Sequence, residues 1–338
     1  MSQAADEVMD LIFGRWRSQT LYHGVELGIF EVLADGPRSA DEVAAERDLD
    51  PDNTYRLLRA LGSLGLLDES PDGTFSLTER GRLLTSDHEP SLRDIARLIE
   101  SPEQYAVWPR LSDLVRTGDE EAFEDEFGQT MFEYIQANPE HAEVFNEAME
   151  SNSAVETRDV LSALEGYDFS DVSRICDVGG GTGHLLGHLL AEHPHLEGEV
   201  LELPQVVEQA GDLPEEVGVA DRMTFTAGDM FEQVPAADAY LMKQITPDWN
   251  DEECVEILET VRAAAPEGAP VLVADQIVPG PDTPHFSKVF DLHMLLMTGG
   301  RLRTVEEFRD LFRESGLEFV DHHAAEDASM SVAEARVD

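Results

Sequence analysis

Lysine is scarce in this chain, and basic residues as a whole are few. Of 23 basic residues only Lys243 and Lys288 are lysine, against 71 acidic residues, so the formal net charge is −48. Such an acidic surface repels nucleic acids and anionic membranes and argues against either as a partner. Because 42% of residues are apolar, the acidity does not indicate disorder. Concentrated salt screens the self-repulsion, so we expect a halophilic source rather than a mesophilic one.

Cysteine and long apolar runs are also scarce. The two cysteines, Cys176 and Cys254, do not make a disulfide scaffold. No apolar run approaches the ~18 residues that a membrane span needs. Residues 1–7 carry neither the basic region nor the apolar core of a signal peptide. We therefore expect a cytoplasmic protein, with room in its 338 residues for two domains.

The segment from Asp177 to Gly183 is the most informative motif. Glycines at 179, 181 and 183 give the spacing G-x-G-x-G between a predicted strand and a predicted helix. A dinucleotide site needs G-x-G-x-x-G, but the sixth residue counted from Gly179 is His184. The spacing instead favours S-adenosylmethionine (SAM), which carries no pyrophosphate. A tight glycine turn without a ligand is the alternative.

Strand and helix patterns alternate through the C-terminal half, which indicates a parallel sheet covered on both faces. After a predicted helix at 304–315, two segments can pair antiparallel at one edge of the sheet. These segments are 317–320 and 331–335. The predicted strands are 172–177, 199–203, 223–227, 238–242 and 270–275, and the helices between them are 183–193, 204–210 and 251–264.

The N-terminal region reads as three helices followed by a hairpin, which is a winged-helix arrangement. Ser39 and Glu42 form a capping-box pattern, Asp50 precedes the third helix, and 70–73 is a hairpin turn signal. Acidic residues outnumber basic ones on the third helix and wing, whereas DNA binding needs a basic face. We therefore favour a dimerisation role for this module. Residues 91–164 read as mostly helical.

Further candidate ligand residues follow the strands, because ligands of open parallel sheets lie beyond the C-terminal strand ends. Glu202 can accept hydrogen bonds from ribose hydroxyls, and Asp229 can accept one from an adenine amino group while Met230 covers the ring. Each is otherwise an ordinary surface acid or turn residue. The expected cofactor-binding residues are Asp177, Gly179, Gly181, Gly183, Glu202, Leu203, Gly228, Asp229, Met230, Lys243 and Trp249.

The chain resembles the plant-type small-molecule O-methyltransferase family, which has bacterial and archaeal members. The resemblance covers residues 12–336 and implies an α/β fold: a Rossmann-like class I SAM methyltransferase domain, mostly parallel with an antiparallel edge, preceded by a mostly helical winged-helix dimerisation domain. It implies homodimers and three segments, 1–90 for dimerisation, 91–165 as a substrate-lining helical linker and 166–338 for SAM binding. Besides the glycine loop, the matching segments are Glu26–Phe30, Arg56–Leu61, Phe75–Thr78, Leu203–Val206, Gly228–Phe231 and Gly299–Thr304.

The chain departs from the family at the catalytic positions. The resemblance places the family's catalytic histidine at Pro247 and its two supporting acids at Asp275 and Leu302. Placement of the acceptor against the SAM methyl group can contribute ~7–11 kcal/mol, whereas a general base adds only ~10²–10⁴-fold. We therefore expect transfer mainly by proximity and orientation, to a hydroxyl of a small aromatic or conjugated molecule, ideally an acidic phenol or enol.

Several side chains are candidates for a replacement base or for the acceptor pocket. A neutral histidine accepts a proton near neutral pH, although a buried packing role for His293 is the slightly favoured alternative. The candidate catalytic residues are His293, Asp291, Asp248 and Asp275. By resemblance, the substrate-binding residues are Trp108, Phe145, Met149 and Met294.

The sequence also fits functions other than O-methylation. The missing histidine also fits a SAM-dependent C- or N-methyltransferase, a SAM enzyme that does not methylate, or a SAM-binding sensor without chemistry. His184 and His188 have the i, i+4 spacing of metal ligands, but no third ligand pattern accompanies them. We expect a solvated helix face there and no metal site.

The net charge leads to a prediction about salt. Raising KCl from about 0.1 M to about 1 M shortens the Debye length from about 10 Å to about 3 Å, which weakens repulsion among the acids. We expect the melting temperature, followed by circular dichroism, to rise by several degrees. A melting temperature that does not change with salt would contradict the halophilic interpretation.

Overall fold

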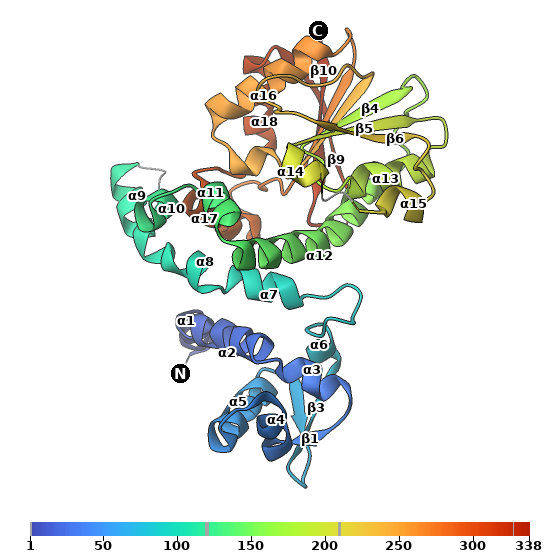
Figure 1. Cartoon of the computed structure of the whole chain (residues 1–338). Coiled ribbons are helices and arrows are strands. Elements are labelled where there is room, and N and C mark those ends of the chain that lie inside the picture. Colours follow the sequence, from blue (N-terminus) through green and yellow to red (C-terminus); the bar gives the residue numbers. More distant parts are fainter. Residues whose placement is uncertain (1, 119–121, 209–210, 327) are drawn as a thin grey trace. The chain divides into compact units, whose positions relative to one another are not determined.

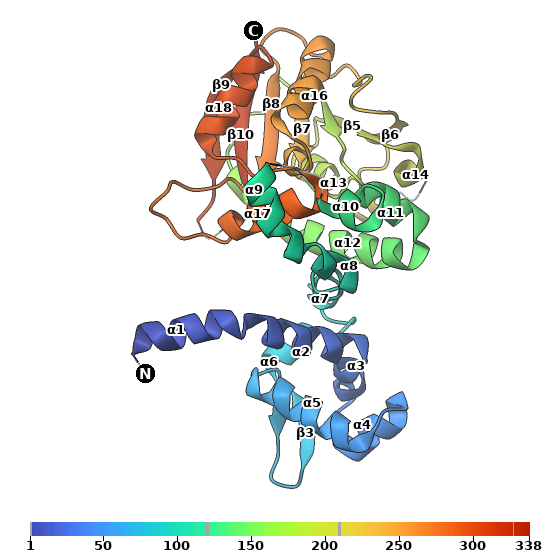
Figure 2. The same cartoon turned by 90° about the vertical axis from the view of Figure 1, so that its left-hand side faces the viewer.

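The computed structural model describes residues 2–118, 122–208, 211–326 and 328–338 (Figures 1 and 2). The chain forms two compact units. One comprises Met1–Trp108 and Phe132–Asn152, and the other Pro109–Met131 and Ser153–Asp338. The three-segment division at residues 90 and 165 stays a prediction.

The first unit contains the predicted winged helix. A three-stranded antiparallel sheet in the order β1-β3-β2 follows the expected helices. Its strands are β1 (Arg38–Ser39), β2 (Leu67–Glu69) and β3 (Thr74–Leu77), and its first helices are α1 (Gln3–Ile12), α2 (Gly14–Glu26), α3 (Ile29–Ala34), α4 (Ala40–Arg47), α5 (Pro51–Ser63) and α6 (Glu79–Arg82).

Local sequence signals determine where these helices start. Ser39 and Glu42 form the predicted capping box of α4. Asp50 accepts a hydrogen bond from the Asn53 amide at the start of α5, and Pro51 occupies the first helical position, where no amide proton is needed. The inward faces of these helices and of β3 then bury one apolar cluster.

The predicted helical region between residues 91 and 164 is confirmed, and it contributes to both units. The longest helix, α12, belongs to the first unit up to Asn152 and to the second from Ser153. The elements are α7 (Arg93–Ile99), α8 (Pro102–Ala106), η1 (Trp108–Arg110), α9 (Leu111–Thr117), α10 (Ala122–Phe127), α11 (Met131–Ala137) and α12 (Pro139–Ala163).

The second unit is built on a seven-stranded sheet in the order β6-β5-β4-β7-β8-β10-β9. Within this sheet β4, β5, β6, β7 and β8 are parallel, and β10 pairs antiparallel with both β8 and β9. This class I fold with an antiparallel edge confirms the prediction. The strands are β4 (Arg174–Val178), β5 (Glu197–Glu202), β6 (Met223–Ala227), β7 (Ala239–Lys243), β8 (Pro270–Asp275), β9 (Leu317–Ala324) and β10 (Ser331–Val337).

Helices cover both faces of this sheet, as Figure 1 shows. One apolar cluster joins α16 and α18 to one face, and a second joins α13 and the end of α12 to the other. The helices of this unit not yet named are α13 (His184–Glu192), α14 (Pro204–Val207), α15 (Leu213–Glu216), η2 (Thr246–Asp248), α16 (Asp251–Ala264), α17 (Ser287–Thr298) and α18 (Val305–Glu314).

Several predicted boundaries need correction by two or three residues. The strand predicted at 172–177 begins at Arg174, and the strand predicted at 199–203 begins at Glu197. The helix predicted at 204–210 is α14, which ends at Val207, and residues 209 and 210 lie outside the described residues. Such ends depend on hydrogen-bond partners in neighbouring strands, which the local pattern does not contain. In the part of the chain that the structure describes, the helices are all too short or too polar to cross a bilayer.

Candidate active site

Acidic and basic side chains gather where the parallel strands of the second unit end. Asp177 on β4 pairs in register with Val200 on β5 and with Leu241 on β7. Glu202 and Lys243 each lie two residues beyond those partners. Because side chains alternate along a strand, Asp177, Glu202 and Lys243 all project from the same sheet face. Sequence reasoning placed all three at the cofactor site, and the sheet brings them together.

The glycine loop that follows β4 turns with left-handed backbone angles. Gly179, Gly181 and Gly183 have φ values of 67°, 59° and 79°, a region that side chains with a Cβ rarely adopt. A Cβ at Gly179 would lie 2.4 Å from Ile245 Cδ1, and one at Gly183 would lie 2.1 Å from Met223 Cε. A Cβ at Gly181 would meet no described atom within 4 Å. Gly181 is therefore the position where this loop leaves room for a ligand.

Asp177, on β4, is a buried acid whose carboxyl group could bind a cationic ligand. Its side chain is 1% exposed, and neither carboxyl oxygen has a hydrogen-bond partner among the described residues. Burial raises its pKa to about 7; Lys243 opposes this shift and Glu202 adds to it. A buried carboxylate without a donor is costly, so a cationic ligand group would stabilise it. The α-amino group of SAM is such a group, so Asp177 and the space at Gly181 fit this cofactor.

Glu202 holds the glycine loop in the present structure. Its Oε2 accepts a hydrogen bond from the Gly181 amide at 3.1 Å, and its Oε1 accepts one from the Leu203 amide at 2.8 Å. The Gly228 amide donates to the Glu202 carbonyl at 3.0 Å, which places the Gly228–Asp229 turn beside it. The contacts of Glu202 and Asp229 with ribose and adenine stay predictions.

Apolar side chains lie beside these polar groups. Met230 Sδ lies 4.0 Å from the position of a Cβ on Gly179, on the same side as Ile245. Trp249 packs edge to face on Phe231, with ring centroids 4.9 Å apart. Sequence reasoning found Met230 and Trp249 but missed Ile245. Its only signal was its place just past a predicted strand end.

The candidate bases Asp248 and Asp275 lie close to each other at the end of β8. Asp275 is 2% exposed, and its Oδ2 accepts a hydrogen bond from the Thr246 hydroxyl. Its Oδ1 has no hydrogen-bond partner within the described ranges. The pKa of each acid is raised to about 7, mainly by burial, and for Asp248 the charge of Asp275 contributes to this shift. Two neighbouring carboxyls that resist ionisation are a common source of a proton acceptor active near neutral pH.

The other two candidate bases lie on α17, which contacts η2. The Asp291 carboxylate accepts a hydrogen bond from the Leu302 amide at 2.7 Å, so it holds the turn after α17. His293 is buried and stacks on Phe290, with ring centroids 5.7 Å apart. Burial lowers the His293 pKa to about 4. His293 is therefore neutral near pH 7 but a weak base.

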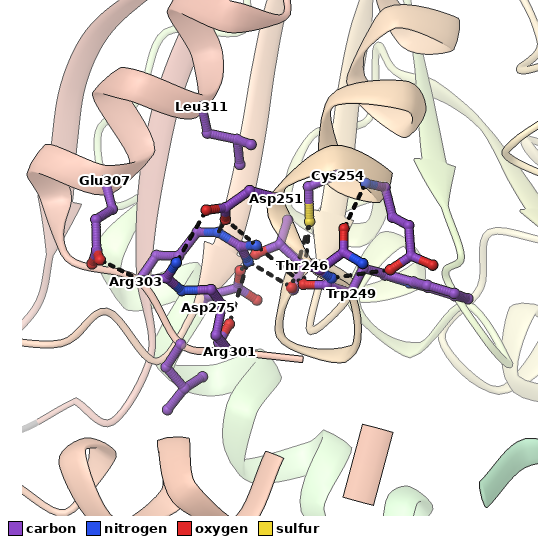
Figure 3. Close-up of polar contacts among 12 residues, drawn as sticks. Thr246, Trp249, Asp251, Cys254, Asp275, Arg301, Arg303, Glu307 and Leu311 are labelled. Atoms are coloured by element: carbon purple, nitrogen blue, oxygen red, sulfur yellow. Dashed lines mark hydrogen bonds and ion pairs between the residues drawn. The ribbon is translucent and has the colours of Figure 1, made fainter. Parts of the chain in front are cut away.

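Arg303 holds the loop that carries Pro247 and Asp248 (Figure 3). Its buried guanidinium donates to the carbonyls of Thr246 at 2.7 Å and Trp249 at 3.1 Å, and it pairs with Asp251 at 2.7 Å. Arg301 also binds Asp251, at 3.0 Å. Sequence reasoning missed Arg303, although it lies in the matching segment Gly299–Thr304.

Gly300 allows a close approach on the same loop. A Cβ there would lie 2.0 Å from the Pro247 carbonyl oxygen, so a side chain would displace the loop. Gly300 and Arg303 together fix the backbone around Pro247.

The predicted acceptor wall is divided between the units. Trp108, Phe145 and Met149 belong to the first unit, and Met294 belongs to the second, where it is buried on α17. Their contact with an acceptor stays a prediction.

The expectation of a solvated histidine face on α13 is wrong. His184 and His188 are half-buried, and Thr157 of α12 lies 2.9 Å from Nδ1 of His184. Burial and the neighbouring His188 lower the His184 pKa to about 4. Among the described residues, no group of three or more His, Cys, Asp or Glu side chains is placed to hold a metal ion.

The sheet and the glycine loop define a class I methyltransferase, and comparisons with known proteins identify the branch. Residues 108–318 match the O-methyltransferase domain family, and residues 9–87 match the O-methyltransferase dimerisation domain. A phenazine O-methyltransferase from Lysobacter antibioticus is 37% identical over 97% of this chain and 95% of its own.

Solved structures agree with this relationship. The crystal structure of LaPhzM superposes with a TM-score of 0.91 at 34% identity, over 100% of both chains. Human N-acetylserotonin methyltransferase, solved in complex with SAM, gives 0.86 at 28% identity over 99% of this chain and 98% of its own. The chain therefore belongs to the O-methyltransferase family, and it is a SAM-dependent O-methyltransferase with an N-terminal dimerisation domain.

The pKa of Asp177 predicts how cofactor affinity depends on pH. The ionised carboxylate binds a cationic amino group, and the protonated acid does not. SAM affinity should therefore fall as the pH drops below the pKa of about 7, by up to about tenfold per unit. Calorimetric titration with SAM between pH 5.5 and 8.5 measures this.

The matched control is Asp177→Asn, which should bind SAM more weakly and lose most of the pH dependence. A wild-type profile that is flat across this range would show that Asp177 does not face the amino group.

Proposed function

We propose that this enzyme methylates a hydroxyl of a small aromatic or conjugated molecule, mainly by holding the acceptor against the methyl group of SAM. The observation that carries the proposal is Pro247. By the resemblance, Pro247 stands at the family's histidine position, and its side chain cannot accept a proton. Arg303 and Gly300 fix the loop that carries it. The phenazine O-methyltransferase relative is named for an aromatic acceptor, which supports an acceptor of this kind here.

The chemistry allows transfer without a strong base. Bound SAM supplies a methyl group activated by its sulfonium. The acceptor oxygen attacks the methyl carbon, the carbon–sulfur bond breaks, and its electron pair stays on sulfur. Placement in line can contribute ~7–11 kcal/mol. An acidic phenol, partly ionised before it binds, needs the least help in losing its proton.

We assign the remaining proton transfer to Asp248. A general base is most effective when its pKa lies near the working pH, and that of Asp248 is about 7. Asp275 is bound by Thr246 and supports Asp248 by raising its pKa. Asp291 is engaged by the Leu302 amide. The low pKa of His293 makes it the weaker acceptor.

This assignment predicts the effects of two substitutions on the rate. Asp248→Asn should lower kcat by about 10–100-fold for a weakly acidic phenol and by much less for an acidic one, because only the first needs a base. It should also remove the loss of kcat below pH 7. His293→Ala should leave that pH dependence in place. Steady-state kinetics on phenols of graded acidity in concentrated KCl measure these effects.

Two outcomes would contradict the proposal. Equal losses for all phenols would show that Asp248 only supports the fold. SAM binding without methylation of any hydroxylated acceptor would favour the sensor interpretation.

We also propose that the enzyme is a homodimer joined through its N-terminal helices. None of the residues of α1 is buried, and its apolar side chains lie open together with Trp16 of α2. Leu11 is 81% exposed and Trp16 is 67% exposed. These positions lie in the segment that matches the dimerisation domain. An apolar face of this kind is typical of an obligate interface.

Charge on this face should separate the protomers. Leu11→Arg combined with Trp16→Arg should convert the dimer to a monomer, because two cations would be buried without partners. Light scattering during size-exclusion chromatography measures the mass. Val115→Arg, at an exposed position on α9, is the control and should leave the dimer intact. A dimer that survives the double substitution would place the interface elsewhere.

A further inference from the structure

Glu156 is a buried acid to which the proposed mechanism gives no role. It lies in the part of α12 that belongs to the second unit, and it is 4% exposed. Its Oε2 accepts a hydrogen bond from Lys243 Nζ at 2.7 Å, and its Oε1 accepts one from Gln244 Nε2 at 3.0 Å. Gln244 has a left-handed φ of 56°, which is unusual outside glycine. Glu156 therefore fixes both residues at the end of β7.

Lys243 has a second acid within reach of its flexible side chain. It projects from the same sheet face as Asp177, on the neighbouring strand, two residues beyond the partner of Asp177 in the register. Both oxygens of Asp177 nevertheless lack a partner in the described part of the chain. The ammonium group pairs with Glu156 of the helix instead.

We propose that Glu156 holds Lys243 away from Asp177 and so keeps the Asp177 carboxylate available for the amino group of SAM. The inference rests on the proposed role of Asp177 at the cofactor site. Glu156 is then a positioning residue that acts through Lys243. It makes no contact with the cofactor itself.

The charges around Asp177 support this role. The charged groups that act on Asp177 are Glu202 from β5 and Lys243 from β7. Glu156 from α12 pairs with Lys243, and His184 from α13 lies near Lys243. His184 is neutral near pH 7 because its pKa is about 4. While Glu156 neutralises Lys243, Asp177 and Glu202 leave the site negative, which suits SAM with its sulfonium and amino charges. Without the Glu156 charge, Lys243 would pair with Asp177, an acid on the same sheet face whose oxygens have no donor among the described residues.

Calorimetric titration of the wild type and its variants with SAM at constant KCl tests the inference. Glu156→Gln should raise Kd about tenfold at pH 8, because SAM must then displace Lys243; a tenfold effect equals one pKa unit of interaction. Adding Lys243→Met should restore most of this loss, because the competitor is gone. Glu156→Gln should also shift the pH dependence of binding to lower pH, since Lys243 would favour ionised Asp177.

The control is Glu199→Gln, which neutralises a buried acid paired with Arg174 on the opposite sheet face, and it should not change Kd. An unchanged Kd in Glu156→Gln would overturn the inference. A loss of SAM affinity that Lys243→Met does not restore would also overturn it, because Glu156 would then have only a structural role.

If Glu156→Gln does not fold, the comparison is Lys243→Met with and without Glu156→Gln. In the Lys243→Met background, Glu156→Gln should change Kd less than about twofold, and a tenfold rise in Kd would overturn the inference.

Asp177→Asn separates this inference from the site assignment. If that variant binds SAM as the wild type does, the proposed role of Asp177 fails. If it binds weakly while Glu156→Gln binds normally, the role of Asp177 stands and only the role of Glu156 fails.

Discussion

The in-register parallel pairing of β4 with β5 and β7 is the constraint on which the site depends. It brings the ends of three strands together and turns Asp177, Glu202 and Lys243 to one face. The left-handed loop after β4 then places bare backbone over the same edge. A slip of one residue between two strands would move one of these side chains to the opposite face. The electrostatics of the cofactor site thus follow from the register of the sheet.

The same edge contains two buried acids that remain hard to ionise, and their surroundings differ. Asp177 lacks a donor on either oxygen within the described residues, which suits a cationic ligand. Asp275 is bound by Thr246 and acts on Asp248 through its charge. In a chain with 71 acidic residues, burial therefore distinguishes the acids to which we assign a chemical role.

The loop around Pro247 is held by contacts to its backbone. Arg303 donates to two backbone carbonyls of that loop, and Gly300 packs against the Pro247 carbonyl. Neither contact involves the side chain at position 247. The position of this backbone therefore does not depend on which side chain stands at residue 247. Chemistry that depends on placement is the kind that such a scaffold supports.

Features with local causes were determined by the sequence alone. The glycine loop, the capping box at Ser39 and the alternation of strands and helices depend on backbone freedom and on neighbours a few residues apart. The strand order, with β10 between β8 and β9, was decided only by the tertiary structure. The same holds for Arg303 and for Glu156, which is 87 residues from Lys243 in the chain. Such pairings depend on which distant segments pack together, and the spacing of nearby residues does not predict these long-range contacts.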